Sequence, residues 1–299
     1  MKTLFALIKR NNKIFFKDKA MFITSLITPL ILLVLYVSFL ANVYKDSFIS
    51  AMPAELVGDG SLVNGLVAGQ LVASLLAVSS VTVAFCSNLL MVQDKVSGAR
   101  RDLLVAPIKS TTLSLAYFLS SASVTLIVSL VALFAGLVYM AFVGWYLSFL
   151  DVLLLIGDVV FLVLFGTALS SVINSRLKTN GQASAVGTIV SSGYGFLCGA
   201  YMPISNFPAA LRGVISFLPG TYGTSLLRTH AQQGVYSAMK KAGFSPELIE
   251  EIKDSTDVNL CFFDTSVTTL VKYLILIGSA VIITLLYVLL CKYERKKKR

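Results

Sequence analysis

Long runs of apolar residues dominate this chain of 299 residues and determine the architecture that we expect. No Asp, Glu, Lys, Arg or His occurs between Asp59 and Asp94, or between Lys109 and Asp151, which leaves uncharged runs of 34 and 41 residues. About 20 apolar helical residues cross the ~30 Å hydrocarbon core of a bilayer, so each run is long enough to span it. Because the runs are continuous rather than alternating, they favour membrane helices over a membrane β-barrel.

The pattern as a whole predicts an all-α integral membrane protein with six transmembrane helices. The expected spans are residues 20–41, 62–92, 112–142, 152–173, 182–198 and 268–290. Pro29 should kink the first span, and Trp145 and Tyr146 should lie at a membrane interface. We expect one transmembrane domain, comprising all 299 residues.

The N-terminal segment 1–19 is amphipathic when it is drawn as a helix. Its basic and apolar residues fall on opposite arcs: Lys2, Lys9, Arg10, Lys13 and Lys17 on one, and Leu4, Leu7, Ile8, Ile14 and Phe15 on the other. This predicts a helix that lies in the membrane interface. A cleavable signal peptide fits less well, because the charges are dispersed and no small-x-small cleavage site follows. A simple basic flank of the first span remains an alternative.

Composition and charge support the membrane assignment and predict an orientation. Only 13% of the residues are charged, compared with about 25% in soluble domains, and the mean hydropathy is +0.82. The net charge of +10 does not indicate nucleic-acid binding, because the basic residues cluster at the ends of apolar runs. Eighteen of the 25 Lys and Arg residues, but only four of the 15 acidic residues, lie in segments 1–19, 94–109, 174–180 and 292–299. The positive-inside rule therefore predicts six spans with both termini in the cytoplasm.

The sequence contains no recognisable catalytic or metal-binding constellation. Cys86, Cys198, Cys261 and Cys291 lack metal-ligand spacing, although a bridge between Cys198 and Cys261 stays open because both are expected toward the outer side. His230 has no cysteine or second histidine near it, which argues against a metal site. Without a GxxxxGK[ST] motif the chain should not bind ATP through a P-loop, and we expect it not to be an enzyme by itself.

Asp158 is the one acidic residue well inside an apolar run. An intramembrane carboxylate suggests ion coupling or substrate contact. It lies only seven residues from Asp151, roughly 10 Å along a helix, so a position near the outer headgroups is the favoured alternative.

The segment 94–107, DKVSGARRDLLVAP, lies between the second and third spans and must therefore emerge into water. It combines an acidic start, a glycine, two arginines and an apolar edge before the final proline: Asp94, Gly98, Arg100, Arg101, Leu103, Leu104, Val105 and Pro107. A short helix of this design can dock in a groove of a soluble partner, with apolar contacts at its centre and charges at the rim.

The segment 199–230 is broken by three prolines and four glycines, yet it is otherwise apolar. This favours a re-entrant or interfacial helical hairpin on the outer side, because irregular backbone must be buried in protein at membrane depth. A polar excursion, 232–264, follows. Within it, Ser245 as N-cap and Pro246 at the first helical position predict a short helix over 246–254.

Together these features resemble the type-2 permeases of ATP-binding-cassette (ABC) exporters. The resemblance rests on the basic N-terminal helix, the six spans, the segment ending in LLVAP after the second span, and a proline-rich outer region. Positions similar to that family's outer region are Gly199, Pro203, Pro208, Pro219, Tyr222 and Arg228. Asp94 stands where the family commonly has Glu, and the 232–264 excursion is longer and more polar than in many members.

The resemblance implies that residues 94–104 form a coupling helix that sits in a cleft of a separate ATPase subunit, with the N-terminal helix bracing it. ATP and Mg would be bound by that subunit and not by this chain. Two permease chains, identical or different, would assemble with two ATPase chains, pairing through the first, second and fifth spans. The setting implied is a bacterial cytoplasmic membrane.

The expected substrate is an amphiphile, such as a drug, a lipid, a lipid-linked glycan or a hydrophobic peptide, moved outward. Polar and aromatic residues of the presumed path are Asn64, Gln70, Asn88, Gln182, Tyr194 and Phe196. Interhelical hydrogen bonding and packing would explain each of them equally well. The alternative hypothesis is a secondary transporter or a sensory membrane protein that works without an ATPase.

Overall fold

The computed structural model describes residues 2–51, 60–106, 108–263 and 265–297, and it is almost entirely helical. The first half contains α1 (Lys2–Lys17), α2 (Lys19–Leu35), a π-helical turn η1 (Tyr36–Leu40), α3 (Ala41–Ala51), α5 (Ser61–Ser87), α6 (Leu89–Val96), α7 (Ala99–Val105) and α8 (Ser110–Val143). The second half contains α9 (Phe149–Arg176), α10 (Asn180–Leu197), a 3-10 turn η2 (Ile204–Asn206), α11 (Ala209–Ile215), α12 (Pro219–Lys241), α13 (Pro246–Ser255) and α14 (Thr269–Lys297). Strands β1 (Leu260–Phe262) and β2 (Thr265–Val267) pair antiparallel before α14.

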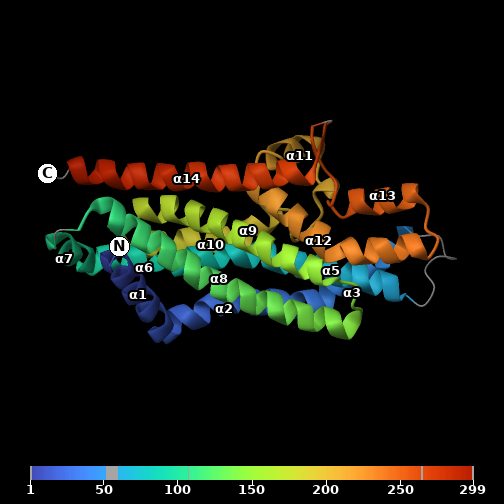
Figure 1. The fold of residues 1–299 in the computed structure, drawn as a ribbon, viewed down its shortest axis with the longest axis horizontal. Helices are drawn as coiled ribbons and strands as arrows, with labels where there is room; N and C mark the ends of the chain where they lie inside the picture. Colours follow the sequence, from blue (N-terminus) through green and yellow to red (C-terminus); the bar gives the residue numbers. More distant parts are fainter. Residues whose placement is uncertain (1, 52–59, 107, 264, 298–299) are drawn as a thin grey trace.

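The long helices run side by side along the longest dimension of the molecule (Figure 1). Both termini and α7 lie at one end, which we call the α7 end, whereas α3 and α13 lie at the other, the α13 end. Within the described residues, five helical stretches are long and apolar enough to cross a membrane: Lys19–Asp46, Ser61–Val96, Ser110–Val143, Phe149–Arg176 and Thr269–Tyr293. The prediction of an all-α membrane protein is confirmed at this level.

Helix α10 occupies the position of the predicted fifth span, and its 18 residues include several glycines and serines. It is not among the five stretches that are apolar enough to cross a membrane on length and composition. Whether α10 crosses the membrane, which would bring the number of spans to six, therefore stays a prediction.

Helix α5 forms the centre of the molecule. Helices α2, α8, α9 and α12 pack around it, and nearly all of its residues are buried. Glycines allow the close approach: a Cβ on Gly69 would lie 2.9 Å from the Ala231 carbonyl oxygen, and one on Gly166 would lie 3.0 Å from that of Ser80. The second span is thus enclosed by its own chain. It therefore offers little free surface to a second permease chain, and its part in pairing stays a prediction.

Two short helices form as the sequence predicts. In α1 the lysines are exposed, whereas Leu7 and Phe15 are buried. Helix α13 begins after Ser245, whose hydroxyl oxygen accepts a hydrogen bond from the Leu248 amide at 3.2 Å. The amphipathic pattern and the capping residues were sufficient to locate both helices.

The predicted boundary between the 199–230 and 232–264 segments is wrong, because α12 runs through it without a break. Pro219 is the first residue of α12, and the glycines within α12 do not interrupt the helix. Gly234 is a close-contact position, since a Cβ there would lie 1.8 Å from the Tyr146 carbonyl oxygen. At the first span, helical structure continues to Ala51, so the polar segment expected from residue 45 is helical at its start. Residues 52–59 lie outside the described part of the chain.

Candidate functional site

A single residue, Asn88, separates α5 from α6, and its side chain holds this junction in place. Asn88 caps α5, and its buried amide donates hydrogen bonds to the hydroxyls of Ser170 at 2.7 Å and Ser171 at 2.9 Å. Both serines lie on α9. The start of α6 is therefore fixed to a membrane-spanning helix by a buried polar contact.

The end of α6 is held by an ion pair with the N-terminal helix. Arg10 donates from Nη1 and Nη2 to the two carboxylate oxygens of Asp94, at 2.6 and 3.1 Å. Tyr117 on α8 donates to the same carboxylate at 2.6 Å. The hydrogen bond to Asp94 raises the pKa of the Arg10 guanidinium. Asp94, predicted as part of the docking segment, is instead a buried residue of α6 that joins α1 and α8.

Lys95 makes a second connection from α6, toward the end of α9. Its ammonium group donates to the carbonyl oxygens of Asn174 at 3.2 Å and Leu177 at 3.1 Å, and to that of Ser175. These carbonyls lie at the C-terminal end of α9, where a helix carries partial negative charge and leaves carbonyls without intrahelical partners. Helix α6 is thus tied to α1, α8 and α9 at once.

Helix α7 follows a tight turn at Gly98, which has a φ of 87°. This left-handed backbone conformation favours glycine. The turn therefore accounts for a glycine at this position better than the predicted close approach of a partner does. Arg101 and Asp102 are exposed, and the Val105 side chain is 88% exposed. The short helix lies at the α7 end (Figure 1), where these charged and apolar side chains are exposed.

The apolar edge predicted for this segment is divided between two faces. Leu103 and Leu104 are half-buried against a hydrophobic cluster that includes Leu7 and Tyr287. Arg100 is also half-buried. Both leucines therefore leave part of their surface free, and their role as a docking edge stays a prediction. Pro107, expected to end the helix, lies outside the described residues.

The residues predicted for the outer region lie at turns and helix starts. Gly199 takes a left-handed φ of 73°, Pro203 and Pro208 precede η2 and α11, and Pro219 begins α12. The Tyr222 hydroxyl donates to the Ser216 carbonyl at 2.6 Å, which closes the turn between α11 and α12. Each of these residues therefore shapes the irregular backbone between α10 and α12.

Arg228 is the most deeply buried charge in the described residues, with 0% of its surface exposed. Its guanidinium donates to Asp257 at 2.7 Å and to the Gly199 carbonyl oxygen. Asp257 also accepts from the backbone amides of Ile204 and Ser205. This ion pair joins α12 to the segment after α13 and to the turn after α10, so it organises the α13 end.

A second buried cluster contains Asp158, for which sequence reasoning found no partner. His230 Nδ1 lies 2.6 Å from one carboxylate oxygen of Asp158, and the Tyr273 hydroxyl donates to the other. The three residues come from α9, α12 and α14. The acidic residue in an apolar run was a sign that a polar partner must exist, since a buried carboxylate requires one.

The six residues predicted for a substrate path do not form a single surface. Gln70 is buried against Gln232, with 2.9 Å between the two amides, and Asn88 is the junction residue described above. Gln182 is exposed and accepts from the Lys178 amide near the start of α10, and Tyr194 packs against Gly220. Asn64 is half-buried and Phe196 is exposed. Packing and local hydrogen bonds account for Gln70, Asn88 and Gln182.

A family model described as the ABC-2 type transporter matches residues 2–230 of the chain. The chain belongs to this family. The match begins in α1, contains the whole α6–α7 segment, and ends within α12. No curated protein matches the sequence. Membership makes the chain the membrane component of a transporter and a multi-pass membrane protein, and it implies partnership with an ABC ATPase.

Proposed function

We propose that this chain is the permease subunit of an ATP-driven ABC exporter and that α7 is its coupling helix. The observation that carries the proposal is the exposed α7 helix on the Gly98 turn, next to a helix α6 that is fixed on three sides. A docking element needs an exposed face, and it needs a rigid attachment to the membrane helices that it moves. ATP and Mg would be bound by the partner subunit.

The contacts of α6 suggest how movement would be transmitted. When ATP draws two ATPase subunits together, α7 would move with the cleft that holds it. The Asp94–Arg10 pair would pass this displacement to α1, and Lys95 and Asn88 would pass it to α9. Coupling of this kind uses rigid elements that have two arrangements and needs no catalytic chemistry in the permease.

The proposed topology has six spans, with α10 as the fifth and both termini in the cytoplasm. It is supported by the concentration of Lys and Arg in the four segments predicted to face inward, and by the two termini lying with α7 at one end (Figure 1). The segment from α11 to β2 would then form the outer side of a permease in a bacterial cytoplasmic membrane, with α11 and the start of α12 as its re-entrant part.

The proposed assembly contains two permease chains and two ATPase chains. Helices α2 and α10 are suited to pairing, because both pack on α5 by one face and expose the other. The exposed face of α10 carries Ser184, Thr188 and Ser192 at helical spacing. A path between two such faces would combine hydroxyl and apolar groups, which suits an amphiphilic substrate moved outward.

Purification of the chain in a mild detergent, with identification of bound proteins, tests the proposal. We expect a P-loop ATPase in a stoichiometric ratio, and an ATP hydrolysis rate that depends on the permease. Val105→Asp should abolish the association. The control substitution Lys13→Gln, at an exposed position of α1, should leave the association intact. A folded chain that binds no ATPase in several detergents would contradict the proposal.

A secondary transporter remains the second candidate, because Asp158 and His230 form a buried ionisable pair among the apolar helices. In that case transport by the purified chain alone should depend on an ion gradient. Transport that requires the ATPase and is insensitive to a protonophore would exclude it.

A further inference from the structure

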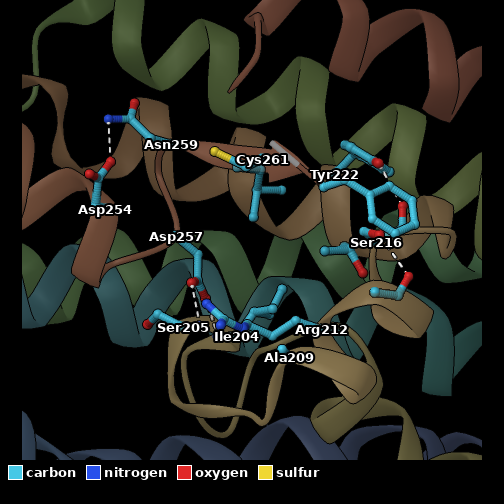
Figure 2. A pocket seen from close by; sticks show the side chains of 14 residues that line it. Ile204, Ser205, Ala209, Arg212, Ser216, Tyr222, Asp254, Asp257, Asn259 and Cys261 are labelled. Carbon is cyan, nitrogen blue, oxygen red and sulfur yellow. Dashed lines mark hydrogen bonds between the residues drawn. The ribbon is translucent and has the colours of Figure 1, made fainter. Parts of the chain in front are cut away.

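A cavity of about 490 Å³ opens at the α13 end, between η2, α11 and the β1–β2 hairpin (Figure 2). This volume lies within the ~300–1,000 Å³ typical of small-molecule sites. None of the residues of α6 and α7 contributes to it. The cavity is therefore separate from the proposed coupling site.

The floor of the cavity is rigid and electrically balanced. Asp257 takes a left-handed φ of 56°, and it accepts hydrogen bonds from Arg228 and from the amides of Ile204 and Ser205. Because the Arg228 charge compensates that of Asp257, the floor does not by itself select a cation or an anion.

Two further charges of opposite sign line the cavity without pairing. Among the described residues, no hydrogen bond or ion pair involves the Arg212 guanidinium, and Asp254 has no cationic partner. Asn259 donates to the Asp254 carboxylate at 2.8 Å and so holds it in position. Figure 2 shows Arg212 on α11 and Asp254 on α13 on different sides of the pocket. The two groups can thus receive a ligand that carries both charges.

The rim of the cavity is aromatic and exposed. Phe263 lines the cavity with 64% of its surface exposed, and it packs edge-on against Phe217 and Phe262, with ring centroids 6.1 and 5.0 Å apart. Phe263 has a φ of 52°, which is costly for a bulky side chain.

The aromatic rim lies close in the chain to the start of α14. Strand β2 ends at Val267, and α14 begins at Thr269 as one of the helices able to cross a membrane. Leu270 and Leu274, in the first turns of α14, are both exposed. In the proposed topology, the β1–β2 hairpin that lines the cavity leads directly into this membrane helix.

We propose that this cavity binds the headgroup of a zwitterionic phospholipid from the surrounding bilayer. The phosphate would bind Arg212, the ammonium group would bind Asp254, and the acyl chains would lie along Phe217, Phe262 and Phe263. Arg212 and Asp254 are both exposed. An anionic lipid would place a second negative charge beside Asp254, and an uncharged amphiphile would gain no Coulombic attraction from either group. The proposal does not depend on which substrate the permease exports.

Cys261 provides a reporter for this site, because its free thiol is exposed and lines the cavity. Cys198 and Cys291 are buried, and Cys86→Ser removes the one half-buried thiol. The full-length Cys86→Ser protein in maltoside detergent is titrated with dihexanoyl phosphatidylethanolamine, and the rate of Cys261 labelling by a water-soluble maleimide is measured. Dihexanoyl phosphatidylglycerol is the matched anionic probe.

We expect phosphatidylethanolamine to slow labelling and phosphatidylglycerol to do so much less. Arg212→Gln and Asp254→Asn should each raise the half-protecting concentration about tenfold, in line with the loss of one charge-assisted contact. Lys241→Gln, an exposed change away from the cavity, should leave it unchanged. An unchanged labelling rate without lipid shows that each variant is folded at the cavity. Equal protection by both lipids, no protection beyond that given by the detergent, or protection that survives both substitutions would overturn the proposal.

Discussion

Arg10 and Asp94, which are 84 residues apart in the chain, form a two-pronged ion pair that attaches the N-terminal helix to the end of α6. Tyr117 donates to the same carboxylate, so three helices meet at one group. The next helix after this junction is α7. The position of the proposed coupling helix thus depends on a contact with a helix that lies outside the membrane-spanning segments.

We expect Arg10→Gln to lower the free energy of unfolding by about 1–2 kcal/mol. Charge-assisted hydrogen bonds usually stabilise a fold by slightly more than this, and the estimate is lower because solvent screens the partly exposed guanidinium. Thermal unfolding in detergent measures the change, and Lys13→Gln on the same helix is the control. In a double-mutant cycle with Asp94→Asn, the two changes should not add. Additive effects would mean that the pair does not hold α1 in place.

Removing Arg228 should be more damaging than removing any exposed charge of α12. Arg228→Met leaves Asp257 buried with only backbone amides as partners, and breaking a buried pair in this way costs about 3–5 kcal/mol. Lys240→Met, at the exposed end of the same helix, should change stability by less than about 0.5 kcal/mol.

The double variant Arg228→Met with Asp257→Asn provides the check on this mechanism. It should recover part of the loss, because the unpaired buried charge is gone. If the double variant is less stable than Arg228→Met alone, the uncompensated carboxylate is not the cause.

The Asp158 cluster should matter for stability more than for coupling. Asp158→Asn weakens contacts to His230 and Tyr273 and should cost about 1–3 kcal/mol, measured by thermal unfolding. Since the cluster joins α9, α12 and α14 and does not touch α6 or α7, ATP hydrolysis per folded complex should remain near its original rate. Loss of transport without loss of folded protein would instead favour an ion-coupled mechanism.

Two glycines in helices should respond in opposite ways to alanine. A Cβ on Gly234 would collide with the Tyr146 backbone, so Gly234→Ala should destabilise the protein by about 1–3 kcal/mol. Gly278 in α14 has open space at the corresponding position, and Gly278→Ala should be neutral or stabilising by up to about 1 kcal/mol. Comparable unfolding temperatures for the two variants would argue against the close packing of α12 on the α8–α9 connection.

The sequence predicts the parts of this fold that the bilayer and local chemistry impose. Uncharged runs locate the long helices, and Ser245 with Pro246 locates α13. The glycines of α12 misled the prediction, because glycine weakens an isolated helix but permits another segment to approach the helix backbone closely. Local sequence does not reveal such a contact, since Tyr146 lies far from Gly234 along the chain.

Pairs between distant residues explain most of what the sequence missed in the candidate site. Asp94 was assigned to an exposed segment because its partners, Arg10 and Tyr117, belong to other helices. Asp158 had no apparent partner, although His230 lies 72 residues away. A rule that every carboxylate in an apolar run needs a buried donor would have suggested the only histidine in the chain.

The measurement that tests the central claim most directly is site-specific photo-crosslinking from α7. A photoreactive amino acid replaces Val105, which is 88% exposed at the α7 end, and in a matched protein it replaces the exposed Phe149 at the start of α9. The proposed function predicts that position 105 crosslinks to the ATPase subunit and that the yield changes when ATP is added, whereas position 149 gives no such product. An absence of ATPase crosslinks from position 105 in an intact complex, or equal yields from both positions, would contradict the assignment of α7 as the coupling helix.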